Sequence, residues 1–386
     1  MISIMRATDN ACGKRYLEIA ECLYADIRDG RCAAARSFPS LTRIMRRFGV
    51  TRVTAMRSVD ELKRRGVVVA SPRSRIVVKR TNRTFGLILP GLAYSEFFSM
   101  IMSEISRRCQ QEGYGLLFKD IYSPQSRLTE QHAKDLVRDF VQKQVDGVLF
   151  LPFEFMPTTR SVNKEIVSTL RDAGIPVVLI DYDIVLPPER SSLDVVGINN
   201  FDAGRRVAEH LLSKGAKNIH FFHYGVGAIS VANRIAGVKS AIRVGGVGCR
   251  GRNVLQVEGK GSDAGMVRAY LKRHRPDAFV CANDANAAYL KHILDCMGRR
   301  IPEDMMLAGF DDLRYATVMT PQLTTVHQPC ADIASVAVRT LKERIDDPSL
   351  PPREILLSAP LVVRESTCRG GVAAGRKTKE TPRCRK

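Results

Sequence analysis

The 386-residue sequence contains no tryptophan, and aromatic residues make up only 6% of it. It also has no apolar run of about 20 residues, the length that crosses a bilayer, and no signal-peptide core near its first residue. We therefore expect a soluble protein of the reducing cytoplasm that does not bind a membrane. The lack of tryptophan removes the commonest stacking platform for sugars.

Signals of catalysis and metal binding are also missing. The ten cysteines form no CxxC pair and no Cys/His cluster at zinc spacing. No Walker A loop and no nucleophile-elbow serine is present. Residues 246–251 fit GxGxxG, but they follow an expected helix and precede an expected strand, the reverse of a dinucleotide-binding turn. His220 and His223 would point to opposite faces of a strand. We expect no enzyme activity, no metal and no cofactor.

Positive charge is concentrated at the two ends of the chain. The net charge is +20. Residues 1–83 hold 19 basic and 7 acidic side chains, residues 84–368 hold 34 and 32, and residues 369–386 hold 7 and 1. This distribution favours a polyanionic partner at the ends. The last segment, 369–386, is rich in Gly, Lys and Arg, so we expect a disordered basic tail.

The segment from Phe38 to Arg65 predicts two short helices joined by a tight turn. Pro39-Ser40 is typical of a helix start, Gly49 ends the first helix, and Thr51 caps the second. Apolar residues recur at helical spacing in both, at Leu41, Ile44, Met45 and Phe48 and then at Ala55, Met56, Val59 and Leu62. The opposite face of the second helix is basic, with Arg52, Arg57, Lys63, Arg64 and Arg65. This pattern indicates a helix-turn-helix with its second helix in the DNA major groove, or an ordinary helical hairpin with a solvated basic face.

The flanking segments favour DNA binding. An amphipathic helix is expected at about 14–28, and two strands at 67–70 and 76–79 would form a wing. Residues 14–80 resemble the DNA-binding domain of GntR-family regulators in three segments, at 38–40, 48–54 and 62–66. The resemblance implies that double-stranded operator DNA is contacted by Ser40, Thr51, Arg52, Thr54 and Arg57, and the wing adds Arg73 and Arg75 in place of the family's glycines.

From residue 84 onward, apolar strands alternate with helices. The strands are apolar almost throughout, which indicates parallel sheets covered on both faces. Two such runs predict an α/β core with two lobes. We expect domains at 1–80 (winged helix-turn-helix), 81–84 (linker) and 85–368 (core). The lobes should divide near 183–193, and the chain should cross back near 326–350. Residues 355–363 are expected to form one final strand.

The core, about 84–368, resembles the effector-binding core of LacI-family repressors, which is itself similar to periplasmic sugar-binding proteins. The motifs with the highest specificity are Gly309–Asp312, Thr320–Pro329 and Leu361–Thr367. The combination with a GntR-type domain looks like the arrangement of the Gram-positive arabinose repressor. In that family the effector binds between the lobes, and the matching residues here are Asp181, Arg234, Asn283, Asp311 and Gln328. Phe97, Phe98 and Tyr182 are candidates for a stacking wall, or else core residues.

Carboxylates, amides and a guanidinium suit the hydroxyl groups of a sugar. The structural alternative for each polar residue is a helix cap or a hydrogen bond between the lobes. We therefore expect a homodimeric transcription regulator, a repressor of carbohydrate-utilisation genes that a small-molecule sugar releases from its operator. A purine or nucleoside is the alternative effector. A solute-binding protein of a transporter is disfavoured by the winged helix and the missing signal peptide.

Overall fold

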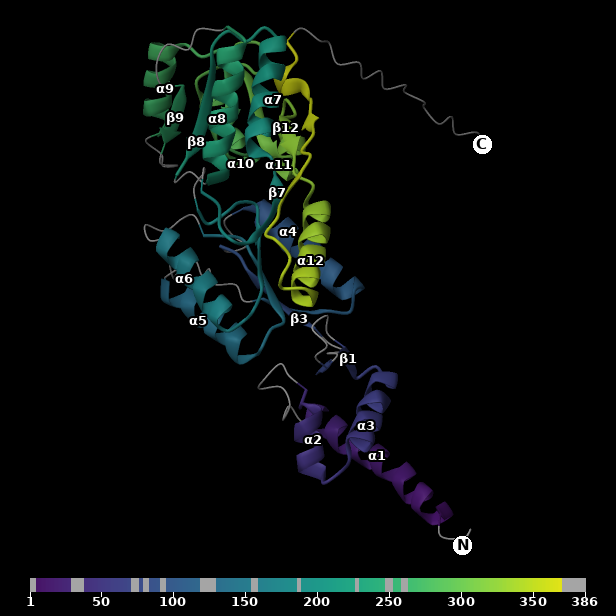
Figure 1. Cartoon of the computed structure of the whole chain (residues 1–386). Helices are drawn as coiled ribbons and strands as arrows, with labels where there is room; N and C mark the ends of the chain where they lie inside the picture. Colours follow the sequence, from purple (N-terminus) through teal and green to yellow (C-terminus); the bar gives the residue numbers. More distant parts are fainter. Residues whose placement is uncertain are drawn as a thin grey trace, which may run out of the picture. The chain divides into compact units, whose positions relative to one another are not determined.

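The computed structural model describes residues 5–28, 38–70, 76–78, 83–90, 95–118, 130–153, 159–185, 189–225, 229–246, 253–257 and 263–369. The chain divides into two compact units, residues 1–83 and 84–386 (Figure 1). The division falls inside the predicted linker, residues 81–84. The two units are described separately.

The first unit is a three-helix domain with a small hairpin. Its helices are α1 (Met5–Arg28), α2 (Leu41–Phe48) and α3 (Arg52–Arg64). The predicted apolar faces meet in one core, made of Ile19, Ala20, Leu23, Phe38, Ile44, Ala55, Val59, Leu62 and Val68. Strands β1 (Val68–Ala70) and β2 (Ile76–Val78) pair antiparallel, with Val69 opposite Val77. The winged helix-turn-helix is therefore confirmed. Arg73 and Arg75 lie outside the described residues.

The second unit has two lobes, each built on a six-stranded sheet. Lobe 1 has the strand order β13-β7-β6-β5-β3-β4, and all of its neighbouring strands are parallel. Its strands are β3 (Thr84–Ile88), β4 (Gly115–Phe118), β5 (Gly147–Phe150), β6 (Val177–Ile180), β7 (Asp194–Ile198) and β13 (Glu354–Leu357). Its helices are α4 (Glu96–Gln111), α5 (Glu130–Gln142), α6 (Thr159–Asp172) and α12 (Cys330–Asp346).

Lobe 2 repeats this architecture with the order β14-β12-β11-β10-β8-β9, in which only β14 runs antiparallel to its neighbour. Its strands are β8 (Ile219–Tyr224), β9 (Val254–Val257), β10 (Ala278–Cys281), β11 (Met306–Asp311), β12 (Thr324–His327) and β14 (Leu361–Val362). Its helices are α7 (Asn200–Ser213), α8 (Ile229–Val244), α9 (Asp263–His274), α10 (Asp284–Cys296), α11 (Arg314–Val318) and the 3-10 turn η3 (Glu365–Thr367).

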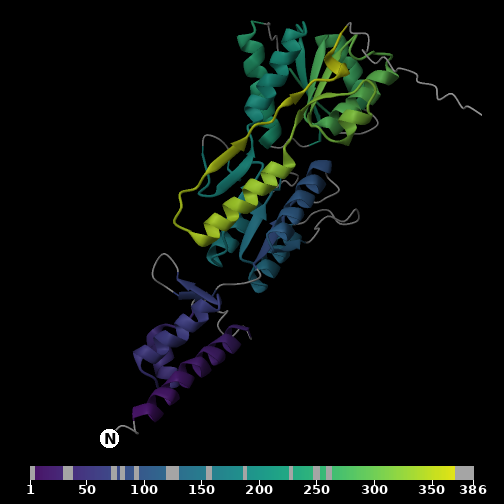
Figure 2. The same ribbon diagram turned by 90° about the vertical axis from the view of Figure 1, so that its right-hand side faces the viewer.

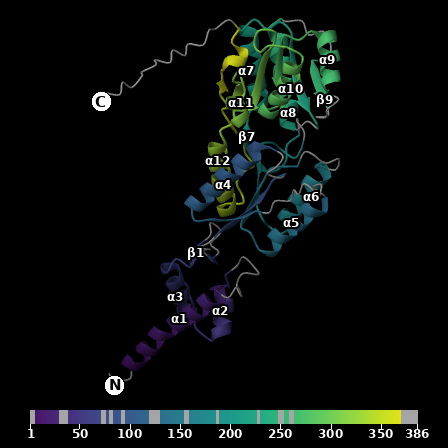
Figure 3. The same ribbon diagram turned by 180° about the vertical axis from the view of Figure 1, so that it is seen from behind.

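Helices cover both faces of each sheet, as the apolar strands predict. In lobe 1, α4 and α12 pack on one face and α5 and α6 on the other (Figures 1 and 3). In lobe 2, α7 and α8 cover one face, and α9 and α10 cover the other. The strands β5 and β6 are buried along their whole length because both of their faces meet helices.

The predicted lobe division near 183–193 is wrong. Strand β7 pairs with β6 and β13, so it belongs to lobe 1, and the chain enters lobe 2 only at Asn199-Asn200. It returns to lobe 1 between β12 and α12, within the predicted 326–350 segment. A third crossing lies between β13 and β14, so the single strand expected at 355–363 is two strands in different lobes (Figure 2).

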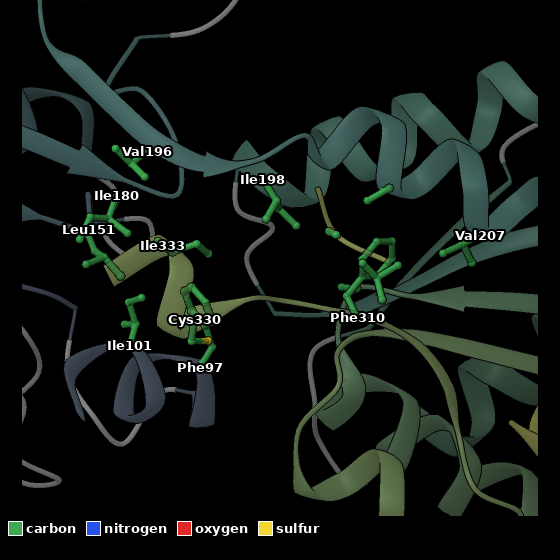
Figure 4. Close-up of a cluster of buried hydrophobic side chains, with 14 of the residues drawn as sticks. Phe97, Ile101, Leu151, Ile180, Val196, Ile198, Val207, Phe310, Cys330 and Ile333 are labelled. Carbon is green, nitrogen blue, oxygen red and sulfur yellow. The ribbon is translucent and has the colours of Figure 1, made fainter. Parts of the chain in front are cut away.

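One apolar cluster continues through both lobes. Figure 4 shows Phe97 of α4 and Cys330 of α12 in lobe 1, Ile198 at the end of β7, and Phe310 and Val207 in lobe 2. The lobes are therefore joined by packed side chains as well as by the three chain crossings. Among the described residues, no helix is long and apolar enough to span a membrane.

The chain remains attached to lobe 2 as far as Arg369. Its Nε donates to the Pro302 carbonyl at 3.0 Å, and its Nη2 donates to the Asp277 carbonyl at 3.0 Å. The predicted tail therefore starts one residue later than expected. Residues 370–386 lie outside the described part, and their disorder stays a prediction.

Candidate DNA-reading helix and effector site

The predicted capping residues Ser40, Gly49 and Thr51 define the ends of α2 and the start of α3. The hydroxyl oxygen of Ser40 accepts from the Arg43 N–H at 3.3 Å at the start of α2. Gly49 takes a φ of +62°, a conformation in which a side chain would be strained, and it ends α2. The Thr51 hydroxyl then accepts from the Thr54 N–H at 3.5 Å and caps α3. Ser40 and Thr51 are both exposed, which their DNA contacts require, and these contacts stay predictions.

Arg52 and Arg57 lie on the exposed face of α3. Within the described part of the chain neither guanidinium has an ion-pair partner, so both are available to phosphates or base edges. Thr54 differs, because it is only 7% exposed and its hydroxyl is 3.2 Å from that of Thr51. The structure therefore gives Thr54 a role in the cap, and its DNA contact stays a prediction.

The basic residues in the last turn of α3 are held by acidic neighbours. Lys63 pairs with Asp60 at 3.0 Å, and both Arg64 and Arg65 bind Glu61, at 2.8 and 2.7 Å. These two guanidinium groups hold the pKa of Glu61 at about 2. The uncompensated positive charge of α3 is therefore confined to its N-terminal half, the part of a recognition helix that contacts base edges.

In the second unit, Arg234 of α8 is the centre of a buried polar cluster. The side chain is 4% exposed. Its Nε donates to Asn200 Oδ1 at 2.8 Å, its Nη1 donates to the Ala282 carbonyl at 2.6 Å, and Nη1 lies 3.9 Å from Asp311 Oδ1. The guanidinium also lies over the Phe310 ring, 4.4 Å from its centroid. These contacts fix the guanidinium plane and provide the partners that a buried charge requires.

Asp311 and Gln328 complete the lobe 2 side of this cluster. Asp311 is 6% exposed, and Gln328 Nε2 donates to its Oδ1 at 2.8 Å. Burial raises the pKa of Asp311 to about 6, although Arg234 and Gln328 act in the opposite direction. The Oε1 atom of Gln328 is buried and accepts no hydrogen bond from the described residues. An unpaired buried acceptor is costly, and the described residues leave the hydrogen-bonding capacity of this oxygen unsatisfied.

Lobe 1 contributes Asp181, which follows β6. Its carboxylate lies near Asn200, the first residue of α7. Burial raises the pKa of Asp181, while Arg234 and Asn200 lower it. Glu96 at the start of α4 is close enough to Asp311 to raise the pKa of that carboxyl. The sequence therefore brings together acidic groups of both lobes around a single arginine.

The backbone at these strand ends is strained. Asp181 has a φ of +77° and Asp311 a φ of +108°, in a region that non-glycine residues rarely occupy. Such conformations cost roughly 1–3 kcal/mol each and are concentrated at functional sites. Gly197 of β7 makes the first of them possible, because a Cβ there would lie 2.5 Å from the Asp181 carbonyl oxygen.

Arg234 is positioned by an unusually close crossing of α7 and α8. A Cβ on Gly204 would lie 2.2 Å from the Arg234 carbonyl oxygen, and a Cβ on Gly237 would lie 2.0 Å from that of Phe201. Only glycine allows these backbones to approach so closely. The four residues from Arg234 to Gly237 thus supply both the side chain and the helix contact that holds it.

Two other candidate groups have structural roles. Asn283 caps α10, since its Oδ1 accepts from the Asn286 N–H at 2.8 Å, and its effector contact stays a prediction. Phe97 is buried between α4 and α12, as the core interpretation expects, and Phe98 packs partly exposed against the same cluster. The Tyr182 hydroxyl donates to the Pro152 carbonyl at 2.7 Å.

Asn200 and Phe310 were not predicted as site residues. The sequence does contain one signal for Asn200: two asparagines follow β7, and only one can cap α7. Asn199 is that cap, accepting from the Asp202 N–H at 2.9 Å, which leaves Asn200 for Arg234. For Phe310 there was no signal, because an aromatic residue in a buried strand is usually core. Over the described residues, no group of three His, Cys, Asp or Glu side chains is placed to hold a metal ion.

Comparison with known proteins supports the assignment of both domains. Residues 15–78 match the gntR family of bacterial regulatory proteins, and residues 208–367 match a periplasmic binding protein-like domain. The HTH-type transcriptional repressor PurR of Vibrio vulnificus is 27% identical over 82% of this chain and 89% of its own length. The ribose operon repressor of Escherichia coli is 26% identical over 77% of this chain and 86% of its own length.

Among solved structures, the transcription regulator GntR from Chromobacterium violaceum matches with a TM-score of 0.60 and 26% identity, over 74% of this chain and 99% of that one. The fold and its exposed basic helix therefore define a DNA-binding transcription regulator with an effector-binding core. More specifically, the chain joins a GntR-type helix-turn-helix domain to a core like that of the LacI-family repressors.

Proposed function

We propose that the chain is a cytoplasmic homodimer that represses carbohydrate-utilisation genes and leaves its operator when a sugar binds the polar cluster of Asp181, Arg234, Asp311 and Gln328. The regulator contains no catalytic centre in this proposal. The observation that carries it is the composition of the cluster. The groups of the cluster that could bind a ligand are mainly hydrogen-bond acceptors. They are the carboxylates of Asp181 and Asp311 and the unpaired Gln328 Oε1.

An acceptor-rich site selects a ligand rich in donors. Each sugar hydroxyl donates one hydrogen bond and accepts others, so vicinal hydroxyls can pair with Asp181, Asp311 and Gln328 while Arg234 supplies the donors. A phosphorylated sugar is disfavoured, because its charge would be placed near Asp181, Asp311 and Glu96. The proposed effector is therefore an uncharged sugar. The name of the ribose operon repressor among the relatives is consistent with this class.

A purine or nucleoside is the second candidate. It is favoured by the relatives named PurR and by the partly exposed Phe98, whose ring could stack on a base. The purine edge also has donors for the two carboxylates. The two candidates share the same site, so one experiment can separate them.

The proposed coupling acts through the lobes. A ligand held by Asp181 of lobe 1 and by Arg234 and Asp311 of lobe 2 binds one relative arrangement of the lobes more tightly than others. The equilibrium between arrangements then shifts by that difference in affinity. In a homodimer such a shift changes the spacing of the two reading helices, and with it the affinity for operator DNA.

The test is a thermal-shift and calorimetry panel on the full chain, with free pentoses and hexoses, sugar phosphates, purine bases and nucleosides. We expect a neutral sugar to raise the melting temperature and to weaken operator binding. Arg234→Ala should lose about 2–5 kcal/mol of effector affinity, because the acidic groups around it stay buried without a counter-charge. The control, Arg268→Ala, removes an exposed arginine of α9 and should bind like wild type.

If purines or nucleosides bound and no sugar did, the sugar proposal would be wrong and the second candidate would replace it. If Arg234→Ala kept full effector affinity, the polar cluster would not be the effector site. A folded Arg234→Ala protein that loses operator binding would place this residue in the coupling path instead.

A further inference from the structure

The exposed face of α3 carries two apolar side chains that no described residue of its own unit covers. Val53 is 62% exposed and Met56 is 44% exposed. The helical pattern predicts Met56 in the buried stripe with Ala55, Val59 and Leu62, and this prediction is wrong, because Met56 points away from the domain core. The two residues are three positions apart, so they are neighbours on one helix face.

This apolar pair lies in the half of α3 with uncompensated positive charge. Arg52 precedes Val53 and Arg57 follows Met56, and both arginines are exposed and lack ion-pair partners in the described residues. Further along the helix, Lys63, Arg64 and Arg65 are neutralised by Asp60 and Glu61. A surface with free guanidinium groups around an apolar centre complements a polyanion that presents an apolar group between its charges.

The DNA major groove provides such a surface. Phosphates line its two edges, and the one apolar group on its floor is the 5-methyl group of thymine. A purely solvated helix face would not explain the pair, since valine is a poor helix former and neither side chain gains from contact with water. The arginines can reach phosphates or guanine, and the apolar side chains between them would then face the base edges.

We propose that Val53 and Met56 read thymine methyl groups, so that each operator half-site carries thymines beside the bases reached by Arg52 and Arg57. This proposal rests on α3 being the DNA-reading helix. Removing one methyl group from such a contact should weaken binding about four-fold, which corresponds to about 0.8 kcal/mol per buried carbon.

The experiment starts with the full-length protein and a random-sequence duplex pool, from which binding sites are selected by gel shift. Each thymine of the selected site is then replaced by deoxyuridine, which lacks only the methyl group and keeps the same hydrogen-bonding edge. Wild type should lose about four-fold in affinity at one or two positions per half-site. Val53→Ala and Met56→Ala should each abolish the loss at one of these positions.

Both variants should fold, because the replaced side chains are exposed and alanine favours a helix. Met100→Ala is the matched control, since Met100 is 45% exposed on α4 in the other unit, and it should keep the wild-type response to deoxyuridine. The proposal is overturned if the selected sites contain no recurrent thymine, or if deoxyuridine has the same effect on wild type and variants.

Two further outcomes distinguish a failure of thymine recognition from a failure of the assumption that α3 is the DNA-reading helix. If Arg52→Ala weakens binding but deoxyuridine does not, α3 is the reading helix and thymine recognition is refuted. If Arg52→Ala has no effect, α3 is not the reading helix at all. A change in dimer dissociation of Val53→Ala or Met56→Ala, measured by sedimentation without a change in thymine preference, would make the pair a protein contact and refute the proposal.

Discussion

Asp284→Asn should remove a pH dependence of stability from lobe 2. Asp284 is 1% exposed, its Oδ1 accepts from the Thr325 hydroxyl at 2.6 Å, and its Oδ2 accepts from the Leu313 N–H at 3.0 Å. Burial and the nearby Asp311 and Asp312 raise the pKa of this carboxyl to about 8. Asparagine fits the same contacts, because its oxygen can accept from Leu313 while its amide donates to the Thr325 oxygen.

The sign follows from proton linkage. A carboxyl with a raised pKa holds its proton in the folded state and releases it on unfolding, so stability falls as the pH rises through its folded pKa. For a group with a pKa of about 8, the free energy of unfolding should fall by about 1 kcal/mol between about pH 7 and 8. Asp311 titrates lower, at about 6. The buried His220 has a pKa of about 4. Neither contributes much in this window.

The assay is urea unfolding of the full chain at a series of pH values from about 7 to 8. Wild type should lose about 1 kcal/mol across the series, and Asp284→Asn should be nearly flat. The control, Asp295→Asn, changes an exposed carboxylate of α10 that pairs with Lys291 at 2.6 Å, and it should keep the wild-type slope. An equal slope in Asp284→Asn and wild type would refute the assignment of this proton to Asp284.

Three other predictions, one of them with a control variant, concern other parts of the molecule. Arg52→Ala should weaken specific DNA binding by about 1–3 kcal/mol in a gel shift if the guanidinium reaches a base edge, and an unchanged affinity would contradict its role. Gly237→Ala should lower stability by roughly 1–3 kcal/mol in thermal unfolding, because its Cβ would lie 2.0 Å from the Phe201 oxygen. The control, Gly265→Ala in α9, has nothing within 4 Å of the new Cβ, so it should not lower stability through a steric clash. Deleting residues 370–386 should flatten the salt dependence of non-specific DNA binding, and an unchanged slope would assign the tail no electrostatic role.

Most elements of the core could be predicted, because a parallel strand that is buried on both faces is a continuous apolar run in the sequence. Residues 177–180 and 278–281 are continuous apolar runs, and each forms a strand over the same residues. Strand β12 is different, because it begins with Thr324 and Thr325. Both are fully buried, and their hydroxyls bond to Arg364 and Asp284, contacts that the local sequence does not reveal.

The assignment of strands to lobes could not be predicted in the same way. Strand β7 is apolar and buried on both faces, and it would look the same in either sheet. Its place beside β6 depends on Gly197, which fits against the backbone of Asp181. The break between β13 and β14 did have a local signal, since Pro360 cannot donate to a strand ladder and so marks the point where pairing stops.

On the proposed function, coupling between the lobes follows from the charges of the polar cluster around Arg234. Asp181 and Glu96 belong to lobe 1, Asp311 and Arg234 to lobe 2, and each carboxylate raises the pKa of Asp311. One guanidinium, 3.9 Å from Asp311, is the counter-charge that Asp181 and Asp311 share. On the proposed function, a sugar brings hydroxyl donors to both aspartates at once. It then stabilises the arrangement in which the carboxylates of the two lobes lie close together, which is the arrangement that their repulsion disfavours without ligand. Neutralising one of them, as in Asp311→Asn, should therefore weaken the effect of the sugar on operator binding more than it weakens operator binding itself.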